Sequence, residues 1–435
     1  MSSSARAWLV VGLLWLVACI NWSARGMIVT MHDSVVSVIP MTDAQFGLLT
    51  SSFAWTYGLL SPFAGFLSDR FSRSRVIIVS LIAWSALTWL TGYARNYHEL
   101  LAMRVLMAVS EATYLPASLA LITDYHRGST RSLAVGMHMS GISVGCALAG
   151  IGGWLSERHS WGYPFHLVGL AGIAYGVALI FVLRDAPREA PGRAAEAGGR
   201  SEVRFGRALA SLMSRGSFLL VLVYYGLSGL VGWAILGWMP LFIQTRFHLG
   251  QGAAGFSATG YVNLANLCGV FLGGILADRW SRTHPRGCIL VPAIALCFAT
   301  PGVFLTANTG IPFLAMGGLV AFGLGGGFSD ANMMPILCLI SDRRYRATAY
   351  GLLNFAGAIC GGLAVYMAGL LQDLHFSLVQ ILNGAAVVMV VCPVLLFLIK
   401  PPSEPSAPDE PDGPADKLPL MPAGVPLSAA GSGEV

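Results

Sequence analysis

Apolar runs of about 20 residues recur along this chain from Trp8 almost to Lys400, and they restrict its fold more than any other feature. A helix of that length spans the roughly 30 Å hydrocarbon core of a bilayer, where only helices and closed barrels satisfy their backbone polar groups. Of the 435 residues, 55% are hydrophobic and 11% are charged, whereas soluble domains average about 25% charged residues. The sequence therefore predicts an all-α membrane protein with many spans and excludes an ordinary soluble fold.

Twelve transmembrane helices can be assigned, in two blocks of six. Their expected bounds are 8–31, 44–67, 75–94, 98–124, 131–155, 163–184, 217–245, 253–277, 286–307, 311–340, 346–371 and 376–399. The expected domains are an N-terminal six-helix bundle (1–188), a cytoplasmic central loop (189–214), a C-terminal six-helix bundle (215–400) and a cytoplasmic tail (401–435). The tail is acidic and proline-rich and has too little apolar surface to fold by itself, so we expect it to be disordered.

The arginines of the loops fall almost entirely on one side of the membrane. With residue 1 in the cytoplasm, the outside loops carry only Arg95, Arg158 and Arg246, and the other loop arginines lie inside. Because cytoplasmic loops are enriched in Lys and Arg, this asymmetry predicts that both termini are cytoplasmic. We expect a multi-pass protein of a bacterial inner (plasma) membrane. The formal net charge of +5 follows this loop pattern and does not indicate a nucleic-acid partner.

The two halves of the chain carry related segments. Gly65-Phe-Leu-Ser-Asp69-Arg70-Phe-Ser-Arg73, between the second and third spans, returns as Gly274-Ile-Leu-Ala-Asp278-Arg279-Trp-Ser-Arg282 between the eighth and ninth. Glu111 has a counterpart in Asp330, since each precedes a proline by five residues. A repeat of this kind predicts two pseudo-symmetric bundles with a binding site between them.

The Gly-x-Leu-x-Asp-Arg-x-x-Arg pattern of these segments resembles the second-to-third loop motif of the major facilitator superfamily, and the resemblance covers residues 1 to about 400. It implies a transporter that works by alternating access. It also implies a gating role for the motif residues, which are Gly65, Asp69, Arg70, Arg73, Gly274, Asp278, Arg279 and Arg282. A purely topological role would explain some of the arginines, but not an aspartate among them.

The first and fourth spans resemble the anion:cation symporter family of organic-anion transporters. The segments that carry the resemblance are Asn21-Trp22-Ser23-Ala24-Arg25 and Arg104-x₆-Glu111-Ala112. It implies that the protein moves an organic anion together with a proton. The family has an aspartate where this chain has Ala24, so a proton-coupled mechanism must rely on Glu111 or on another group. Spinster-type lipid transporters share a comparable fourth helix and remain a rival family.

Four charged residues remain inside the spans once the loops are assigned: Arg25, Arg104, Glu111 and Asp330. A charge at bilayer depth is costly unless it faces a cavity or a partner, so each is a candidate functional residue. A planar guanidinium grips both oxygens of a carboxylate and stays charged. We therefore expect Arg25 and Arg104 to bind an anion, and Glu111 and its counterpart Asp330 to serve in proton coupling. The structural alternative is an Arg104–Glu111 link that holds the fourth helix in place.

Polar and aromatic side chains inside the spans are further candidates for substrate binding. They are Tyr57, Tyr114, Tyr261, Asn332 and Asn354, together with Trp233, Asn263 and Asn266. Each can hydrogen-bond a hydroxylated substrate, and each can equally bridge two helices.

These features predict a secondary active transporter that moves a small organic anion, such as a sugar acid or a monocarboxylate, by proton symport. Its expected partners are that anion, the proton and the lipid bilayer, and we expect it to act as a monomer. No nucleotide-binding loop, metal-ligand spacing or nucleophile arrangement occurs, so no enzymatic activity, cofactor or metal is expected. Two alternatives stay open: a spinster-like transporter of lysolipids or amphipathic solutes, and a transporter-like sensor that does not translocate.

Overall fold

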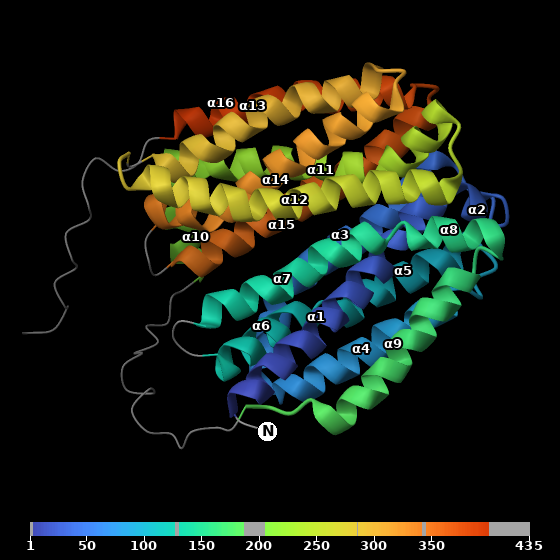
Figure 1. Ribbon diagram of the computed structural model, residues 1–435, viewed down its shortest axis with the longest axis horizontal. Coiled ribbons are helices and arrows are strands. Elements are labelled where there is room, and N and C mark those ends of the chain that lie inside the picture. Colours follow the sequence, from blue (N-terminus) through green and yellow to red (C-terminus); the bar gives the residue numbers. More distant parts are fainter. Residues whose placement is uncertain (1–2, 127–129, 187–204, 285, 342–344, 400–435) are drawn as a thin grey trace, which may run out of the picture. The chain divides into compact units, whose positions relative to one another are not determined.

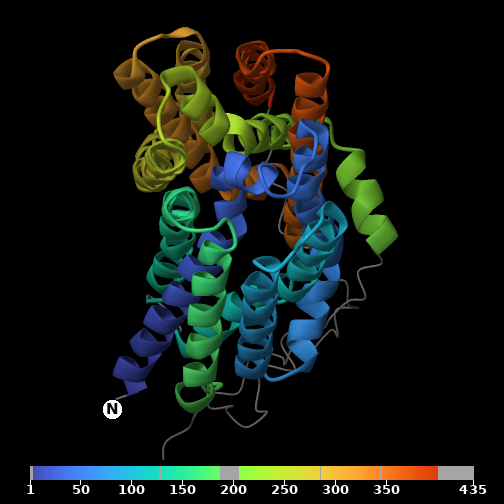
Figure 2. The same cartoon turned by 90° about the vertical axis from the view of Figure 1, so that its right-hand side faces the viewer.

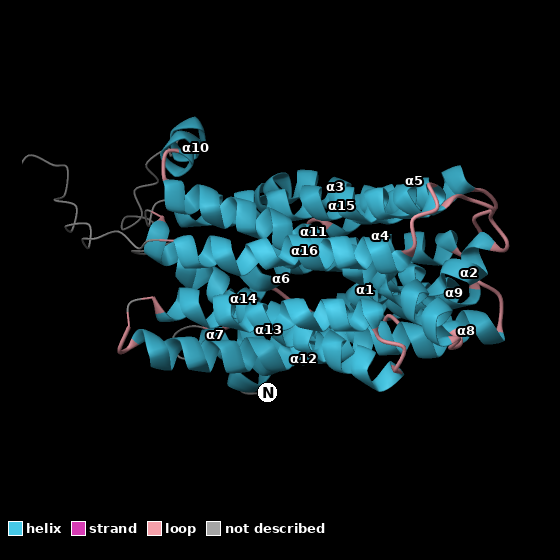
Figure 3. Cartoon of the chain, turned by 90° about the horizontal axis from the view of Figure 1, so that it is seen from above, coloured by secondary structure: helices cyan, strands magenta, loops and turns pink. Residues whose placement is uncertain are grey.

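The computed structural model describes residues 3–126, 130–186, 205–284, 286–341 and 345–399, and within these ranges it contains helices and loops but no strand (Figure 3). The fold class predicted from the sequence, an all-α membrane protein, is confirmed. Residues 401–435, which the sequence assigns to the tail, and most of the predicted central loop lie outside the described ranges. The end of that predicted loop is a short helix, α10 (Phe205–Met213).

The helices fall into two sets along the chain, coloured blue to green and green to red in Figure 1. Residues 3–186 contain α1 (Ser3–Met27), η1 (Ile28–Met31), α2 (His32–Val36), α3 (Asp43–Arg70), α4 (Arg73–Thr91), α5 (Tyr97–Glu111), α6 (Tyr114–Tyr125), α7 (Arg131–Leu148), α8 (Ile151–Arg158) and α9 (Tyr163–Val182). Residues 205–399 contain α10, α11 (Gly216–Phe247), α12 (Gln251–Ser281), α13 (Gly287–Asn308), α14 (Pro312–Ile340), α15 (Arg346–Asp373) and α16 (Leu378–Leu398).

Eleven segments of the described chain are helical, long and apolar enough to cross a membrane. The expected span 44–67 corresponds to α3, which is 28 residues long but is not among these eleven. Some spans contain a break in the helix: one at Ala112 and Thr113, between α5 and α6, and another between α7 and α8. The first break places the carboxylate of Glu111 at the end of a helix within a span.

Buried apolar side chains form one cluster in each set of helices and a third cluster between the sets. The first cluster draws its residues from 10–183 and the second from 212–399. The third joins Phe46 of α3, Trp238 of α11 and Val365 of α15. In Figure 2 most of the blue and blue-green helices lie below the yellow and red ones. We call residues 3–186 the N-terminal half and residues 205–399 the C-terminal half.

The two halves touch mainly through α3 against α15 and α7 against α12. Glycine permits the first contact: a Cβ on Gly47 would lie 2.8 Å from the backbone oxygen of Val365, and one on Gly369 would lie 2.2 Å from that of Asp43. Neither position has room for a side chain. The helices therefore approach closely through small residues, as membrane helices commonly do.

Hydrogen bonds between the halves lie from the middle of the helices to the end that carries α2 and α8. The carboxylate of Asp373 on α15 accepts from the backbone nitrogens of Asp43 and Ala44, each at 3.0 Å. The side chain of Gln251 on α12 donates to serine hydroxyls of α2 and α8 at 2.8 and 2.9 Å. The first residues of α3 are thus capped by a carboxylate from the other half.

At the opposite end, which carries the arginine-rich loops, the hydrogen bonds among the described residues stay within one half. Arg73 pairs with Asp124 in the N-terminal half. Arg215 donates to the backbone oxygen of Ile340 at 3.2 Å in the C-terminal half. Among the described residues, hydrogen bonds therefore join the halves at the end that carries α2 and α8, which the predicted orientation makes the outer end.

We expect Asp373→Asn to weaken the closed outer end. A negative charge at a helix N-terminus is worth about 1 kcal/mol, so its loss should shift the ratio of outer-closed to outer-open molecules about five-fold toward the open form. Spin labels at the exposed positions Val38 and Arg246, which lie in different halves, would report this shift as a longer distance.

Glu99→Gln is the matched control for this experiment. The Glu99 carboxylate accepts from the Arg95 nitrogen at 2.8 Å and from Asn96 Nδ2 at 2.7 Å, within the N-terminal half. Its neutralisation removes a comparable charge near the same end and should leave the label distance unchanged. If Asp373→Asn also leaves the distance unchanged, the capping contact does not hold the outer end closed.

Candidate functional site

α5 carries two of the four predicted intramembrane charges on one buried face. Its buried residues are Leu100, Arg104, Met107, Ala108 and Glu111, which recur every three or four positions or lie next to one another. The side chain of Asn96 accepts from the backbone of the first turn and so starts the helix, which ends at Glu111. Arg104 and Glu111 are 3% and 2% exposed, so both charges point into the protein.

Arg25 lies in the last turn of α1 and is surrounded by aromatic rings. Its guanidinium carbon is 4.4 Å from the ring centre of Trp22, 4.3 Å from that of Phe53 and 5.1 Å from that of Tyr57. The ring of Trp233, on α11 of the C-terminal half, lies at 5.2 Å. We call these four side chains the aromatic enclosure. Because an aromatic face attracts a desolvated cation by about 2 kcal/mol, the enclosure offsets part of the cost of burying Arg25.

Arg104 approaches the same point from α5. Its guanidinium carbon is 4.9 Å from the centre of the Phe53 ring, and its Nη1 donates to the backbone oxygen of Arg25 at 3.3 Å. Phe53 therefore lies against both arginines. Within the described part of the chain, the Arg25 guanidinium contacts the enclosure and donates no hydrogen bond, so its nitrogens can serve an anion.

The Glu111 carboxylate lies beside the Asn21 amide, without a hydrogen bond of ordinary geometry between the two groups. Both side-chain oxygens are buried and accept no hydrogen bond from a described residue, and no described basic nitrogen lies within 4.0 Å of them. Asn21 Nδ2 and Arg104 Nε are likewise buried without a partner. An unsatisfied buried polar atom costs about 1–3 kcal/mol, so this group of atoms favours a bound polar ligand. The Arg104–Glu111 ion pair, considered above as a structural alternative, is absent from this conformation.

Tyr57 and Tyr114, both predicted to bind substrate, have different surroundings. Tyr57 belongs to the aromatic enclosure and is partly exposed. Tyr114 begins α6, its hydroxyl donates to the backbone oxygen of Leu14 at 3.1 Å, and its ring packs edge-on against Trp84. The structure thus brings Tyr57 together with Arg25 and places Tyr114 in the packing between helices.

The predicted polar residues of the C-terminal half form contacts of their own. Asp330 on α14 is exposed, and its Oδ2 accepts from Asn266 Nδ2 on α12 at 3.0 Å. Asn354 on α15 accepts from the hydroxyl of Tyr225 on α11 at 3.2 Å. The pseudo-symmetric counterparts Glu111 and Asp330 therefore differ, because Asp330 accepts a regular hydrogen bond from its amide neighbour and Glu111 accepts none from Asn21.

Asn332 and Tyr261 belong neither to the site around Arg25 nor to the contacts of Asp330 and Asn354. Asn332 is 1% exposed, and its side chain donates to the backbone oxygen of Phe328 at 2.8 Å and to that of Gly273 at 3.4 Å. It thus bridges α14 and α12. Tyr261 on α12 is 47% exposed. Neither contacts Arg25, Arg104 or Glu111 among the interactions of the described residues.

Arg73 of the predicted gating motif is held within the N-terminal half. It pairs with Asp124 at the end of α6. Next to it, the carboxylate of Asp185 accepts from Ser72 Oγ at 2.6 Å and from the backbone nitrogen of Ser74 at 2.7 Å, and so caps α4. The motif therefore contributes to a polar network that ties α4 to α6 and to the segment after α9.

The other motif residues lie at the ends of α3 and α12. Gly65, Asp69 and Arg70 belong to the last turns of α3, and their side chains lie outside the described part of the structure. In the second copy, Gly274, Asp278 and Arg279 belong to α12 and Arg282 follows its last residue. The three charged side chains of this second copy are exposed.

The sequence does not single out Trp22 and Phe53 as site residues, although the structure places both against arginines. A weak signal exists, since Phe53 and Tyr57 are one helical turn apart and Trp22 precedes Arg25 by three positions. Aromatic residues at this spacing are equally common in apolar packing. The pattern indicates a cation site only when the partner helices are known.

The chain combines membrane-crossing helices with a buried charged site, and the family match makes it a membrane transporter rather than an enzyme. The family model of the Major Facilitator Superfamily matches residues 14–365, and the chain therefore belongs to this superfamily. The chain is 25% identical over 388 residues to the D-galactonate transporter of Escherichia coli O6:H1, with 83% of this chain and 87% of the relative covered. It is 24% identical over 319 residues to Protein spinster homolog 1 of Xenopus laevis, with 70% of this chain and 60% of the relative covered.

A solved structure shows the same fold. It is the crystal structure of a bacterial homolog to the human lysosomal transporter spinster, in an inward-facing and unoccupied conformation, and it matches with a TM-score of 0.76. The two chains are 22% identical, and the match covers 91% of this chain and 97% of the other. The match to the family model confirms, at the level of the superfamily, the membership predicted from the repeated loop motif.

We expect Phe53→Leu to destabilise the protein more than the same substitution of a phenylalanine that packs only against apolar side chains. Leucine keeps most of the apolar volume but removes the face that contacts Arg25 and Arg104. The free energy of unfolding should fall by about 2 kcal/mol more than in Phe218→Leu, because Phe218 is fully buried in an apolar cluster. Thermal unfolding of both purified variants in detergent measures the difference. Equal losses would mean that Phe53 acts by packing alone.

Proposed function

We propose that the protein is a secondary active transporter that moves a small organic anion, a sugar acid or a monocarboxylate, by symport with a proton. The observation that carries the proposal is the presence in one buried region of two guanidinium groups and a carboxylate that forms an ion pair with neither. Such a site provides positive charge for an anion and a separate group for a proton.

Arg25 and Arg104 are the proposed anion-binding residues. The aromatic enclosure covers the faces of the Arg25 guanidinium, and hydrogen-bond donors lie along the edges of that group. A carboxylate of the substrate can accept two parallel hydrogen bonds from such an edge. Because Trp233 comes from the C-terminal half, movement of the halves would change the surroundings of the bound anion.

Glu111 is the proposed proton carrier. It interacts electrostatically with Arg25 and Arg104 without an ion pair to either. A bound carboxylate cancels positive charge beside Glu111 and so makes proton binding to Glu111 more favourable. Substrate and proton then occupy the site together, which is the requirement for symport. The position that is acidic in the anion:cation symporter family is Ala24 here, so Glu111 is the first candidate for this role, ahead of its counterpart Asp330.

The similarity to the D-galactonate transporter supports a sugar acid as the substrate class, because the match covers 83% of this chain and 87% of that transporter. The proposal also keeps the predicted topology, in which both termini are cytoplasmic and the binding site lies between the bundles 1–188 and 215–400. A bacterial inner membrane is the expected location.

Neutral substitution of a site arginine should weaken ligand binding. In Arg104→Gln the affinity for a sugar acid should fall more than about tenfold, since a hydrogen bond to a charged group is worth roughly 1.5–3 kcal/mol. A thermal-shift screen of organic acids on the purified protein measures the loss. Arg158→Gln is the matched control, because Arg158 also stacks on a tryptophan, Trp154, at 4.1 Å but is exposed and outside the site. Unchanged binding in Arg104→Gln would rule out the proposed anion site.

Proton coupling should depend on Glu111. In proteoliposomes, Glu111→Gln should keep exchange of labelled for unlabelled substrate and lose accumulation driven by a pH gradient, because glutamine cannot bind and release the proton. Glu157→Gln, at an exposed position on α8, should retain both activities. Gradient-driven accumulation at the wild-type level in Glu111→Gln would contradict the coupling mechanism.

Transport of an amphipathic solute, as the spinster resemblance implies, is a second candidate function. The four rings around Arg25 favour it, because they offer apolar contact beside a positive charge. The same thermal-shift screen separates the two candidates when it includes a lysophospholipid. Stabilisation by the lysophospholipid alone would favour the second candidate.

A further inference from the structure

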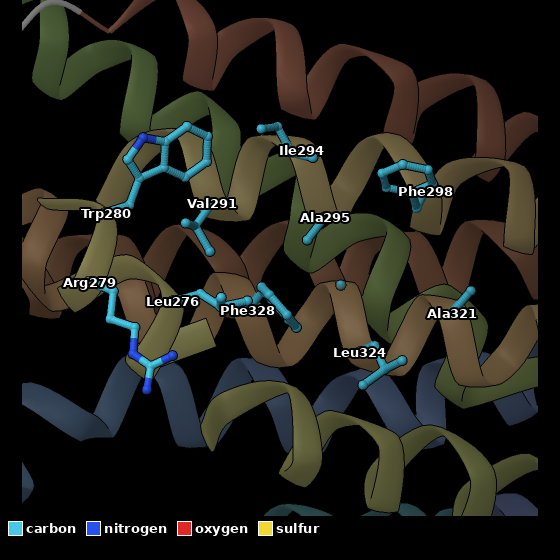
Figure 4. Close-up of a pocket in the computed structure, with 11 residues that line it drawn as sticks. Leu276, Arg279, Trp280, Val291, Ile294, Ala295, Phe298, Ala321, Leu324 and Phe328 are labelled. Carbon is cyan, nitrogen blue, oxygen red and sulfur yellow. The ribbon is translucent and has the colours of Figure 1, made fainter. Parts of the chain in front are cut away.

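A groove of about 680 Å³ lies between α12, α13 and α14 of the C-terminal half, and none of its lining residues belongs to the charged site (Figure 4). Val291, Ile294, Ala295 and Phe298 line it from α13. They recur every three or four positions, and the lining residues of α12 and α14 follow the same spacing. The groove therefore runs along three helix faces for about 10 Å, the length of two helical turns.

Small residues form the floor of this groove and large ones form its walls. A Cβ on Gly325 of α14 would lie 2.6 Å from the Cβ of Ala299 on α13, so these two helices are in close contact beneath the groove. Trp280, Phe298 and Phe328 project around it (Figure 4). Phe298 is 73% exposed, so the groove opens to the surface of the protein.

In a membrane, this surface of the protein contacts lipid. The three helices that form the groove are all long and apolar enough to cross a bilayer. Its lining begins in the last turns of α12 and reaches Phe298 near the middle of α13. With the predicted orientation, this stretch corresponds to the cytoplasmic half of the bilayer. An apolar groove at that depth is filled by the surrounding acyl chains.

One end of the groove is positively charged. Arg279 is the only charged residue among the eleven that line it, and it lies with Trp280 at the end of α12 (Figure 4). Arginine and tryptophan are both favoured where acyl chains meet headgroups. The turn that follows adds Arg282 and Arg286, and Asp278 contributes one opposing charge. A negatively charged headgroup therefore meets net positive charge at this end.

We propose that the groove is a binding site for an anionic phospholipid of the cytoplasmic leaflet. One acyl chain lies over the floor formed by Ala295 and Gly325, and the headgroup phosphate lies at Arg279. The site is independent of the proposed transport function, since it shares no residue with Arg25, Arg104 and Glu111. Because Arg279 also belongs to the predicted gating motif, the lipid binds where the motif and the bilayer meet.

Native mass spectrometry of the purified full chain with added phosphatidylglycerol or phosphatidylcholine tests this site. The wild-type protein should bind phosphatidylglycerol at least about five-fold more tightly, as expected for one arginine near an anionic headgroup. Arg279→Gln should lose this preference and Arg279→Lys should keep most of it. Arg282→Gln is the matched control, because Arg282 lies on the same exposed turn but does not line the groove.

Occupation of the groove by the acyl chain is tested separately. Ala295→Leu fills the floor and should lower the binding of both lipids, whereas Ala174→Leu, at an exposed position on α9, should not. Inorganic phosphate should not displace the bound lipid. Equal binding of the two lipids by the wild-type protein, an unchanged preference in Arg279→Gln, or displacement by inorganic phosphate would each overturn the proposal. The Arg279 variants keep the test decisive if Ala295→Leu does not fold, because Arg279 is exposed.

Discussion

The burial of Arg25 is the constraint on which the site depends. A guanidinium inside a membrane protein must be enclosed by groups that tolerate its charge, and here four aromatic rings from α1, α3 and α11 provide that enclosure. Phe53 also contacts Arg104, which brings α5 to the same point. The rings contact the faces of the guanidinium and offset part of the cost of burying it. They accept no hydrogen bond from its nitrogens, which can therefore donate to a ligand.

The aromatic enclosure extends across the contact between the two halves. The helices α3 and α15 approach through Gly47 and Gly369, and Asp373 caps α3 across the interface. Trp233 is the one member of the enclosure that comes from the C-terminal half. In the proposed mechanism, a movement of one half against the other would therefore change the position of Trp233 relative to Arg25 and so the surroundings of the proposed anion site.

The repeated loop motif shows how equal sequence patterns acquire different surroundings. In the first copy, Arg73 pairs with Asp124 and becomes part of a network within its own half. In the second copy, Arg279 lines an apolar groove on α12. Glu111 and Asp330 differ in the same way, since the Glu111 carboxylate accepts no regular hydrogen bond and that of Asp330 accepts one from Asn266. Pseudo-symmetry predicts position along a helix, and the neighbouring helices decide what each side chain meets.

The sequence by itself determined the helical membrane fold, the superfamily and the intramembrane charges, because a charge in an apolar run is visible without knowledge of any neighbour. It also singled out Tyr57 and Trp233 as candidate substrate-binding residues, and the structure places both rings near Arg25. Only the tertiary structure decided that Phe53 and Trp22 enclose Arg25, that Tyr114 and Asn332 bond to backbone between helices, and that Arg104 and Glu111 do not form an ion pair. The physical reason is that these outcomes depend on the rotation and distance of separate helices, which local spacing along one helix does not specify.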